Sequence, residues 1–338
     1  METIDVREQS STISVVVPCY NEEESLPIFA DALADVVRGM RERWSRISVE
    51  LVIVDDGSSD CTLDVVHCLA ERNDLPYQVR WVSFSRNFGK ESALYAGLEA
   101  SRGSFVATMD VDMQDPPALL PQMYEDLLSG QWDSVATRRV DREGEPPIRS
   151  AFARLFYRII NRISDADIVD GARDFRLMTR PVVDAVLSMA ERNRFTKGIY
   201  GWVGFRTKWI PYENVERAAG ETKWSFFKLA RYALDGVAAF STVPLAIASL
   251  LGGAFCILAL VMAVVVVVRA ALFGDPVAGW PSLMTAILLV GGAQLLCLGV
   301  IGQYLAKAYV ETKHRPIYLA RERGEGREPA HDEGDGRS

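Results

Sequence analysis

The sequence predicts an α/β fold in which a doubly wound, parallel sheet precedes two apolar helices. Over residues 12–109, strand-like runs rich in β-branched residues alternate with helix-like segments, a pattern typical of parallel sheets with helices on both faces. Further along, no charged residue lies between Asp235 and Arg269 or between Asp275 and Lys307. Each gap exceeds the roughly 20 residues that a membrane-spanning helix needs.

The first strand is predicted at residues 12–20, a nearly continuous apolar run that favours burial on both faces. Asn21 is a predicted helix cap, and the glutamates at 22–24 suit the positive end of the helix that follows. Three further strands complete the predicted parallel sheet, with a helix after each of the first two. They lie at residues 49–54, 79–84 and 104–109.

Beyond this sheet, residues 134–139 are predicted as a short strand that ends in two arginines, and residues 149–162 as an amphipathic helix. Residues 174–178 are strand-like. The two-residue period of a strand places Asp174 and Arg176 on the same face.

Composition divides the chain into five parts. They are an N-terminal tail (1–11), an α/β domain (12–224), a juxtamembrane amphipathic helix (225–243), a two-helix transmembrane domain (244–306) and a C-terminal tail (307–338). We expect the tail to be disordered after Tyr318, because it is rich in Arg, Glu and Gly. For the amphipathic helix, an ordinary surface helix is the alternative to one that lies at a membrane interface.

The two spans are predicted near residues 245–268 and 283–305. Buried core helices are the alternative, but two such runs around one short loop favour membrane spans. Lysines and arginines precede the first span and follow the second, whereas the connecting loop carries only Arg269 and Asp275 as charged residues. The positive-inside rule therefore places both termini and the α/β domain in the cytoplasm.

Composition also excludes some classes of function. The net charge of −8 argues against nucleic-acid binding, which needs a basic surface. Only three histidines are present and none lies in a motif, so histidine-based catalysis and a histidine-rich zinc site are poorly supported. The five cysteines are scattered, which suits a reducing compartment, and the N-terminus carries no signal-peptide pattern.

An acidic cluster follows the fourth predicted strand. Asp110, Asp112 and Asp115 surround Gln114, and two prolines end the segment. Carboxylate and amide oxygens suit Mg²⁺ or Mn²⁺, which proteins often hold with one or two carboxylates plus substrate phosphates. An acidic, solvated turn is the alternative interpretation of such a cluster taken alone.

Polar clusters follow the other three strands as well. Because the carboxyl ends of parallel strands meet at one edge of the sheet, where ligands bind in such folds, we expect all four clusters to converge. No glycine-rich dinucleotide or P-loop motif is present. A nucleotide bound there would be held by acids and a metal. The four clusters are Pro18–Glu22, Asp55–Asp60, Arg86–Lys90 and Asp110–Asp115.

Five motifs, in this order, resemble the inverting family 2 glycosyltransferases: Val17–Glu24, Val54–Asp60, Ser85–Lys90, Met109–Pro117 and Asp174–Met178. The chain looks most like the bacterial polyprenyl-phosphate glycosyltransferases, which are similar to dolichol-phosphate mannose synthase and include undecaprenyl-phosphate glucosyltransferases. The resemblance covers residues 12–318. It includes Arg192–Phe195, Gly220–Trp224 and Gly302–Tyr304.

The resemblance implies a GT-A (Rossmann-like) catalytic domain and metal-dependent transfer of a monosaccharide, with inversion, from a nucleotide sugar to a polyprenyl phosphate. The implied donor is UDP-glucose and the implied acceptor is undecaprenyl phosphate, at the cytoplasmic face of the inner membrane. GDP-mannose as donor and a non-catalytic membrane scaffold are the alternatives. A homo-oligomer, a tetramer in relatives, is also implied.

The resemblance assigns roles by motif match. The metal ligands, for Mg²⁺ or Mn²⁺, would be Asp110, Asp112 and Gln114. Donor contacts would come from Pro18, Tyr20, Glu22, Asp55, Asp56, Lys90, Asp110 and Val111. The acceptor phosphate would meet Arg138, Arg149, Lys197 and Lys223. The catalytic residues would be Asp174, Asp112 and Arg138.

Three positions near the predicted site need separate comment. Asp174 matches an acidic active-site residue, and we expect it to orient the acceptor or nearby arginines, with a role as general base as the alternative, because a lipid phosphate is already an ionised nucleophile. Arg173 stands where relatives often have glycine, and adds a positive charge beside Asp174. Asp115 is expected only to cap the turn before Pro116.

Overall fold

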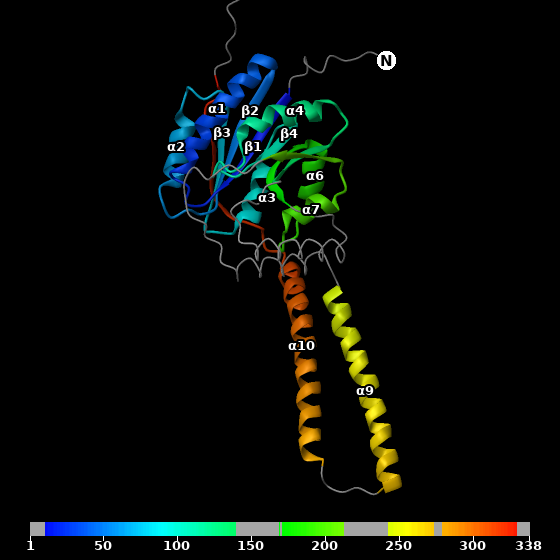
Figure 1. Cartoon of the computed structure of the whole chain (residues 1–338). Helices are drawn as coiled ribbons and strands as arrows, with labels where there is room; N and C mark the ends of the chain where they lie inside the picture. The colour runs from blue at the N-terminus through cyan, green and yellow to red at the C-terminus, as the bar shows by residue number, and fades with distance from the viewer. Residues whose placement is uncertain (1–10, 140–168, 170, 213–242, 274–278, 330–338) are drawn as a thin grey trace, which may run out of the picture.

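Eight strands form one mixed sheet in the order β7-β5-β6-β4-β1-β2-β3-β8 (Figure 1). Neighbouring strands from β4 to β3 are parallel, as are β5 and β7, whereas β6 and β8 pair antiparallel with their neighbours. The strands are β1 (Ser11–Cys19), β2 (Ile47–Asp55), β3 (Gln78–Phe84), β4 (Phe105–Thr108), β5 (Ser134–Arg139), β6 (Ala172–Thr179), β7 (Thr207–Tyr212) and β8 (Ala320–Glu325).

This computed structural model describes residues 11–139, 169, 171–212, 243–273 and 279–329, apart from some side chains within them. Several predictions concern residues outside these ranges: Arg149, Lys223, the helix at 149–162, the loop at 220–224 and most of the juxtamembrane helix at 225–243.

The helices include two very long ones that follow the α/β domain. The described helices are α1 (Ser25–Arg43), α2 (Thr62–Glu71), α3 (Lys90–Ala100), the 3₁₀ turn η2 (Pro117–Leu119), α4 (Leu120–Leu128), α6 (Arg180–Ser188), α7 (Thr196–Trp202), α9 (Val243–Phe273) and α10 (Trp280–Thr312). The predicted strands and helices of residues 12–109 are all present. The first helix begins at Ser25, later than the predicted cap at Asn21.

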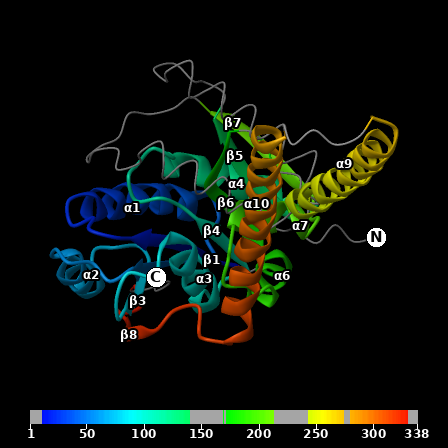
Figure 2. The same ribbon diagram turned by 90° about the horizontal axis from the view of Figure 1, so that it is seen from below.

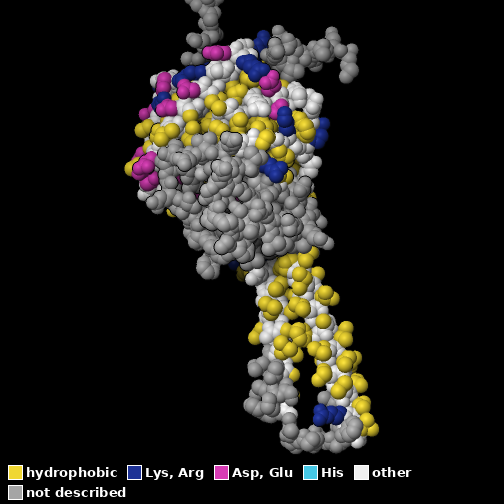
Figure 3. All heavy atoms as spheres, viewed as in Figure 1, with side chains coloured by type: hydrophobic (Ala, Val, Ile, Leu, Met, Phe, Trp, Pro, Cys, Tyr) yellow, Lys and Arg dark blue, Asp and Glu magenta, His cyan; other side chains and the backbone are white. Residues whose placement is uncertain are grey.

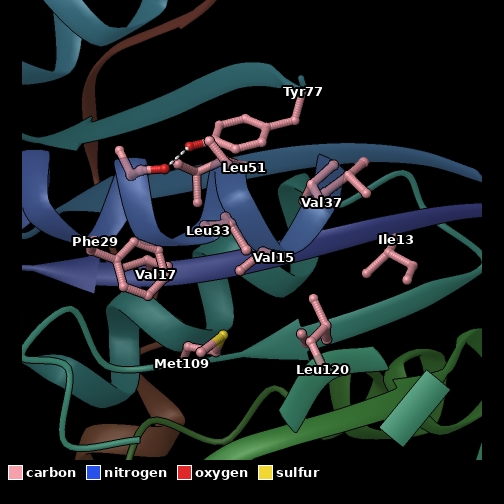
Figure 4. Packing of buried hydrophobic residues seen from close by; sticks show 14 of the residues in the cluster. Ile13, Val15, Val17, Phe29, Leu33, Val37, Leu51, Tyr77, Met109 and Leu120 are labelled. Carbon is pink, nitrogen blue, oxygen red and sulfur yellow. Dashed lines mark hydrogen bonds between the residues drawn. The ribbon is translucent and has the colours of Figure 1, made fainter. Parts of the chain in front are cut away.

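Strand β1 shows why the sheet is covered on both faces. Ile13, Val15 and Val17 pack with α1, α2 and α4 in the larger core cluster, whereas Val16 lies in a second cluster with α3, α6 and α7. This alternation follows from the two-residue period of a strand. Figure 4 shows Phe29 of α1 in the larger cluster beside β1.

Helices α9 and α10 extend from one side of the α/β domain, and the view from below shows α9 diverging from α10 (Figures 1 and 2). Their outer surfaces are covered with hydrophobic side chains (Figure 3). Val243–Met262 and Leu289–Thr312 are long and apolar enough to cross a membrane. Helices that are apolar on all sides, and not buried in a protein core, are typical of membrane spans.

The C-terminal strand β8 corrects our prediction that the chain is disordered after Tyr318. It pairs antiparallel with β3, opposite residues 80–84. Tyr318 stacks on Phe84 with ring centroids 4.8 Å apart, and the indole N–H of Trp81 donates to Glu322 over 3.1 Å. The charged composition favoured disorder, but the open edge of β3 supplies backbone hydrogen-bond partners that composition does not report.

Replacing Gly324 by valine should loosen this strand. A Cβ atom at Gly324 would lie 2.1 Å from the indole of Trp81, so we expect a loss of about 1–3 kcal/mol, the usual cost of overpacking. The measurement is the thermal unfolding of the full chain in detergent. Gly39→Ala is the control, because nothing lies within 4 Å of its added Cβ. Equal unfolding temperatures for Gly324→Val and the unmodified chain would contradict the close packing of β8.

Candidate functional site

The carboxyl ends of β4, β1, β2 and β3 lie next to one another at one edge of the sheet, because these strands are adjacent and parallel. This is the edge at which ligands bind in doubly wound folds. The structure thus brings the four predicted polar clusters together. These clusters lie at or just after the carboxyl ends of β1 (Pro18–Glu22), β2 (Asp55–Asp60), β3 (Arg86–Lys90) and β4 (Asp110–Asp115).

Asp55 and Asp56, predicted donor contacts, both hold neighbouring loops in place. Asp55 is buried and accepts hydrogen bonds from the Ser83 hydroxyl (2.7 Å) and the Ser58 amide (2.9 Å). Asp56 accepts from the backbone amides of Phe88 (2.6 Å) and Gly89 (2.9 Å). Burial raises the pKa of Asp56, while these amide bonds oppose the rise. The two aspartates therefore shape the donor side of the site, and direct contact with a nucleotide stays a prediction.

The loop after β1 is fastened to the loop after β2. Asn21 has a positive φ of 55°, and its side-chain oxygen accepts from the Ser59 amide over 2.9 Å. The amide of Glu22 donates to the Thr62 hydroxyl over 2.8 Å. Asn21 therefore fixes a turn and caps no helix. Nearby, Tyr20 keeps 43% of its surface exposed, which leaves an aromatic ring available at this edge.

Lys90, at the start of α3, joins two of the predicted acids. Its ammonium lies 2.6 Å from Asp110 and also pairs with Asp174 on β6. Lys197, at the start of α7, lies 3.4 Å from the other oxygen of Asp174. We expected Asp174 to orient the acceptor or nearby arginines, and that role stays a prediction. Among the described residues, the ion-pair partners of Asp174 are these two lysines. The network links the metal candidates to the acceptor side.

The charges in this network fix the ionisation of Asp174. Burial alone would raise its pKa, but Lys197 and Lys90 together lower the pKa below the usual value. Burial would lower the pKa of Lys90, whereas Asp110 and Asp174 raise it. Asp174 therefore stays ionised at neutral pH and is a weak proton acceptor. This electrostatic setting favours the orienting role over the role of general base.

The turn between Asp110 and Asp115 is held by contacts from two other strands. Arg173 of β6 donates from Nη2 to the side-chain oxygen of Gln114 over 3.1 Å, and its Nε lies 3.3 Å from Asp115. Tyr212 of β7 donates its hydroxyl proton to Asp115. Asp115 is completely buried. It is thus an ion-pair partner as well as a turn residue, and Arg173 faces Asp115 instead of Asp174.

The donor set of this turn fits a divalent cation shared with a substrate. Among the described residues, no group of three or more His, Cys, Asp or Glu side chains is close enough to bind a metal unaided. Asp115 is completely buried and paired with Arg173, whereas Asp110 is partly exposed and paired with the exposed Lys90. Asp110, Asp112 and the side-chain oxygen of Gln114 therefore form a set of two carboxylates and one neutral oxygen. Mg²⁺ commonly takes one or two carboxylates and completes its shell with waters and substrate phosphates.

On the acceptor side, Arg138 is exposed near the end of β5 and pairs in register with Ala172, two residues before Asp174. Lys197 donates to the carbonyl of Ala172 over 3.1 Å. Two of the four predicted phosphate ligands thus lie near Asp174, and the other two, Arg149 and Lys223, lie outside the described residues.

A pocket of about 330 Å³ opens beside Asp174, between β6, β7 and α7. Arg176 lines it with its guanidinium 4.3 Å from the ring of Tyr200 and 5.3 Å from that of Trp209. Burial lowers the pKa of Arg176 to about 10, although the group stays protonated at neutral pH. Lys197 and Arg173 line the pocket too. Three cations against aromatic walls can receive an anionic group that carries an apolar chain.

Sequence comparison matches residues 14–187 to glycosyl transferase family 2. The chain belongs to this family. It is 40% identical over 307 residues to the prophage bactoprenol glucosyl transferase homolog of Escherichia coli K12, covering 91% of this chain and 97% of that protein. It is also 40% identical to the bactoprenol glucosyl transferase of Shigella phage SfX, covering 92% and 99%.

Among solved structures, the chain is similar to glucosyl-3-phosphoglycerate synthase from Mycobacterium tuberculosis, at 20% identity and a TM-score of 0.45 over 69% of this chain and 79% of that one.

Family membership confirms the expected GT-A fold and the assignment as a glycosyltransferase. In this glycosyltransferase, Lys90 contacts both Asp110, a predicted metal ligand, and Asp174, a predicted catalytic residue. Tyr212, Tyr200 and Trp209 were not predicted as site residues. The strand β7 that carries Tyr212 and Trp209 was not predicted, and an isolated aromatic residue is far more often a core residue than a site residue.

Proposed function

We propose that this glycosyltransferase moves glucose, with inversion, from UDP-glucose to undecaprenyl phosphate at the cytoplasmic face of the inner membrane. The observation that carries the proposal is the contact between the membrane-span candidate α10 and the acceptor side of the site. Glu311, near the end of α10, accepts from the backbone amides of Arg192 (2.8 Å) and Asn193 (3.2 Å). These residues lie shortly before Lys197, so the acceptor side faces the end of the apolar helices.

The relatives support the choice of sugar and lipid. Two proteins named bactoprenol glucosyl transferase, or its homolog, are similar to this chain over almost their whole length. An acceptor that resides in a membrane also gives a physical reason for the helices, which would keep the site next to the lipid's head group. The cation-lined pocket beside Asp174 suits a phosphate that continues into an apolar chain.

Donor binding would use the edge formed by β1 and β2. The exposed ring of Tyr20 would stack on the base, beside Pro18 and Glu22. The loops held by Asp55 and Asp56 would face the ribose, and Val111 would lie beside the donor. Asp110, Asp112 and Gln114 would hold Mg²⁺ or Mn²⁺, which when bound supplies Lewis-acid stabilisation of the departing diphosphate.

Acceptor activation would need no strong base. A lipid monophosphate has a second pKa of roughly 6, by analogy with phosphorylated side chains, so it is mostly ionised at neutral pH. Asp174 would then hold Lys90 and Lys197 in place, and Lys197 with Arg138, Arg149 and Lys223 would orient the phosphate oxygens. Guanidinium groups suit this task because they bind phosphate in a bidentate manner.

Transfer of radiolabelled glucose to a chloroform-extractable product tests the proposal. Purified full-length protein in detergent is given undecaprenyl phosphate and either UDP-glucose or GDP-mannose, with Mn²⁺ or with EDTA. We expect label from UDP-glucose only, and a fall of at least about 10²-fold with EDTA, because a metal contributes several kcal/mol. Label from GDP-mannose alone would identify GDP-mannose as the donor in place of UDP-glucose. Equal label with Mn²⁺ and with EDTA would contradict the metal site. No label from either donor would favour the non-catalytic scaffold.

The assembly proposed for this glycosyltransferase is a homo-oligomer, as the resemblance implies. Sedimentation of the detergent-solubilised chain measures it directly, and a monomeric mass would contradict it.

A further inference from the structure

Arg173 makes contacts with the acidic turn that only a long, multiply donating side chain can make. Its Nη2 donates to Gln114 over 3.1 Å. Its Nε donates to the Tyr212 hydroxyl over 3.0 Å and lies 3.3 Å from Asp115. One side chain from β6 therefore contacts both the acidic turn after β4 and the end of β7.

The acidic turn needs such support because its backbone is unusual. Met113, between the metal candidates Asp112 and Gln114, has a positive φ of 60°. Non-glycine residues adopt this conformation at a cost of order 1 kcal/mol, and it persists only where the surroundings enforce it. The backbone N–H of Gln114 donates to the Asp112 carboxylate over 3.2 Å. Arg173 holds the side chains of Gln114 and Asp115, and Tyr212 also holds Asp115. The turn is fixed on both sides of Met113.

The contact with Arg173 also decides which end of the Gln114 amide is presented. A guanidinium can only donate hydrogen bonds, so Gln114 must turn its oxygen, and not its NH₂ group, toward Arg173. A carbonyl oxygen has a second lone pair, which remains for a cation, whereas the NH₂ group cannot bind one. Arg173 thereby selects the orientation in which Gln114 is a metal ligand.

A cation beside a metal ligand would normally weaken metal binding by repulsion. Asp115 removes this cost here. It is completely buried, lies 3.3 Å from Arg173, and accepts from Tyr212 as well. The ion pair carries little net charge, so it can orient Gln114 without repelling the metal.

We propose that Arg173, held by Asp115 and Tyr212, is a positioning residue that fixes Gln114 as a metal ligand in this chain. The proposal rests on the proposed function, because it assigns the turn to a divalent cation. It adds that this chain supports the proposed metal site through a brace formed by the side chains of Arg173, Asp115 and Tyr212.

The test is a double-mutant cycle on Mn²⁺ binding by the full chain in detergent with UDP present, followed by the electron paramagnetic resonance signal of free Mn²⁺. Arg173→Lys keeps a charge near Asp115 but loses the fork that reaches Gln114. We expect it to weaken Mn²⁺ binding about 10-fold, as changes of residues that orient metal ligands commonly do. When Gln114 is already replaced by alanine, Arg173→Lys should weaken Mn²⁺ binding by less than about 2-fold, because Arg173 then has no Gln114 side chain to orient.

Two further variants separate positioning from general damage. Tyr212→Phe retains the ring but loses the hydroxyl that holds the brace, so it should weaken Mn²⁺ binding in the same direction as Arg173→Lys. Lys208→Met is the matched control, because Lys208 lies on the same strand and its ion pair with Asp126 (2.7 Å) is remote from Gln114. It should leave Mn²⁺ binding unchanged.

The outcomes are distinguishable. Equal losses for Arg173→Lys with and without Gln114 would overturn the positioning role, as would no loss at all, while the proposed metal dependence would stand. An unmodified chain that binds no Mn²⁺ in the presence of UDP would instead overturn the metal part of the proposed function, and the inference with it.

Discussion

Replacing Asp112 by asparagine should reduce glucosyl transfer by about 10³-fold, because a metal that stabilises a departing diphosphate contributes several kcal/mol and each 1.36 kcal/mol is a factor of ten. Among the described residues, Asp110 and Asp112 are the two carboxylates left at this turn once Asp115 is paired with Arg173. Asparagine keeps the shape of the side chain and removes its charge. The loss should therefore appear in kcat and in the Mn²⁺ requirement.

The measurement is the initial rate of label transfer over a range of Mn²⁺ concentrations. Asp126→Asn is the control, since Asp126 pairs with Lys208 away from the site and should keep nearly full activity. If Asp112→Asn retained more than a tenth of the rate at every Mn²⁺ concentration, the metal would not be held at this turn.

Replacing Asp174 by asparagine should lower transfer by about 10²-fold at every pH, the loss expected when reacting groups are misplaced by about 1 Å. Lys90 and Lys197 would lose the carboxylate that holds both of them. Because the pKa of Asp174 is held below its usual value, this residue stays charged throughout an assay range from weakly acid to alkaline pH. Its titration cannot shape the pH profile.

The pH–rate profiles of Asp174→Asn and of the unmodified chain should therefore have the same acid limb, near the second pKa of the acceptor phosphate, roughly 6. The effect of pH on stability is consistent with this. A carboxyl group whose pKa is lowered in the folded state stabilises the fold at pH values above its unfolded-state pKa, roughly 4, and this contribution is lost only as the pH falls below roughly 4. Asp133→Asn, which breaks an ion pair with Arg206, is the control. An Asp174→Asn rate that fails only at low pH and recovers above the phosphate pKa would identify a general base instead.

Local patterns predicted the parallel part of the fold well. Strands β1 to β4 are short apolar runs with polar residues directly after them, and each pattern is complete within about ten residues. The convergence of Asp55, Lys90 and Asp110 then followed from one rule, that the carboxyl ends of parallel strands share an edge. The apolar gaps before Arg269 and Lys307 were equally plain, because the absence of charge over a long run is itself the signal.

The missed features depend on partners far apart in the chain. Arg173 and Asp115 are 58 residues apart, and Tyr212 and Asp115 are 97 residues apart. Nothing near Asp115 in the sequence distinguishes a buried ion pair from a turn cap. Lys90 and Lys197 were predicted as site residues, but their ion pairs with Asp174 were not, since α3 and α7 bring them from separate parts of the chain. Strand β8 was missed because its charged sequence is a poor strand former by itself.

Strand β8 has a consequence for solubility. Without it, β3 would end the sheet with unpaired amide and carbonyl groups, the arrangement that recruits strands from other molecules and leads to aggregation. The chain returns from α10 to cover this edge with a strand whose exposed side chains include Arg321 and Glu325. Charged residues on an outermost strand disfavour further pairing. A chain shortened to remove the charged residues after Tyr318 would therefore lose its protection against edge-to-edge association.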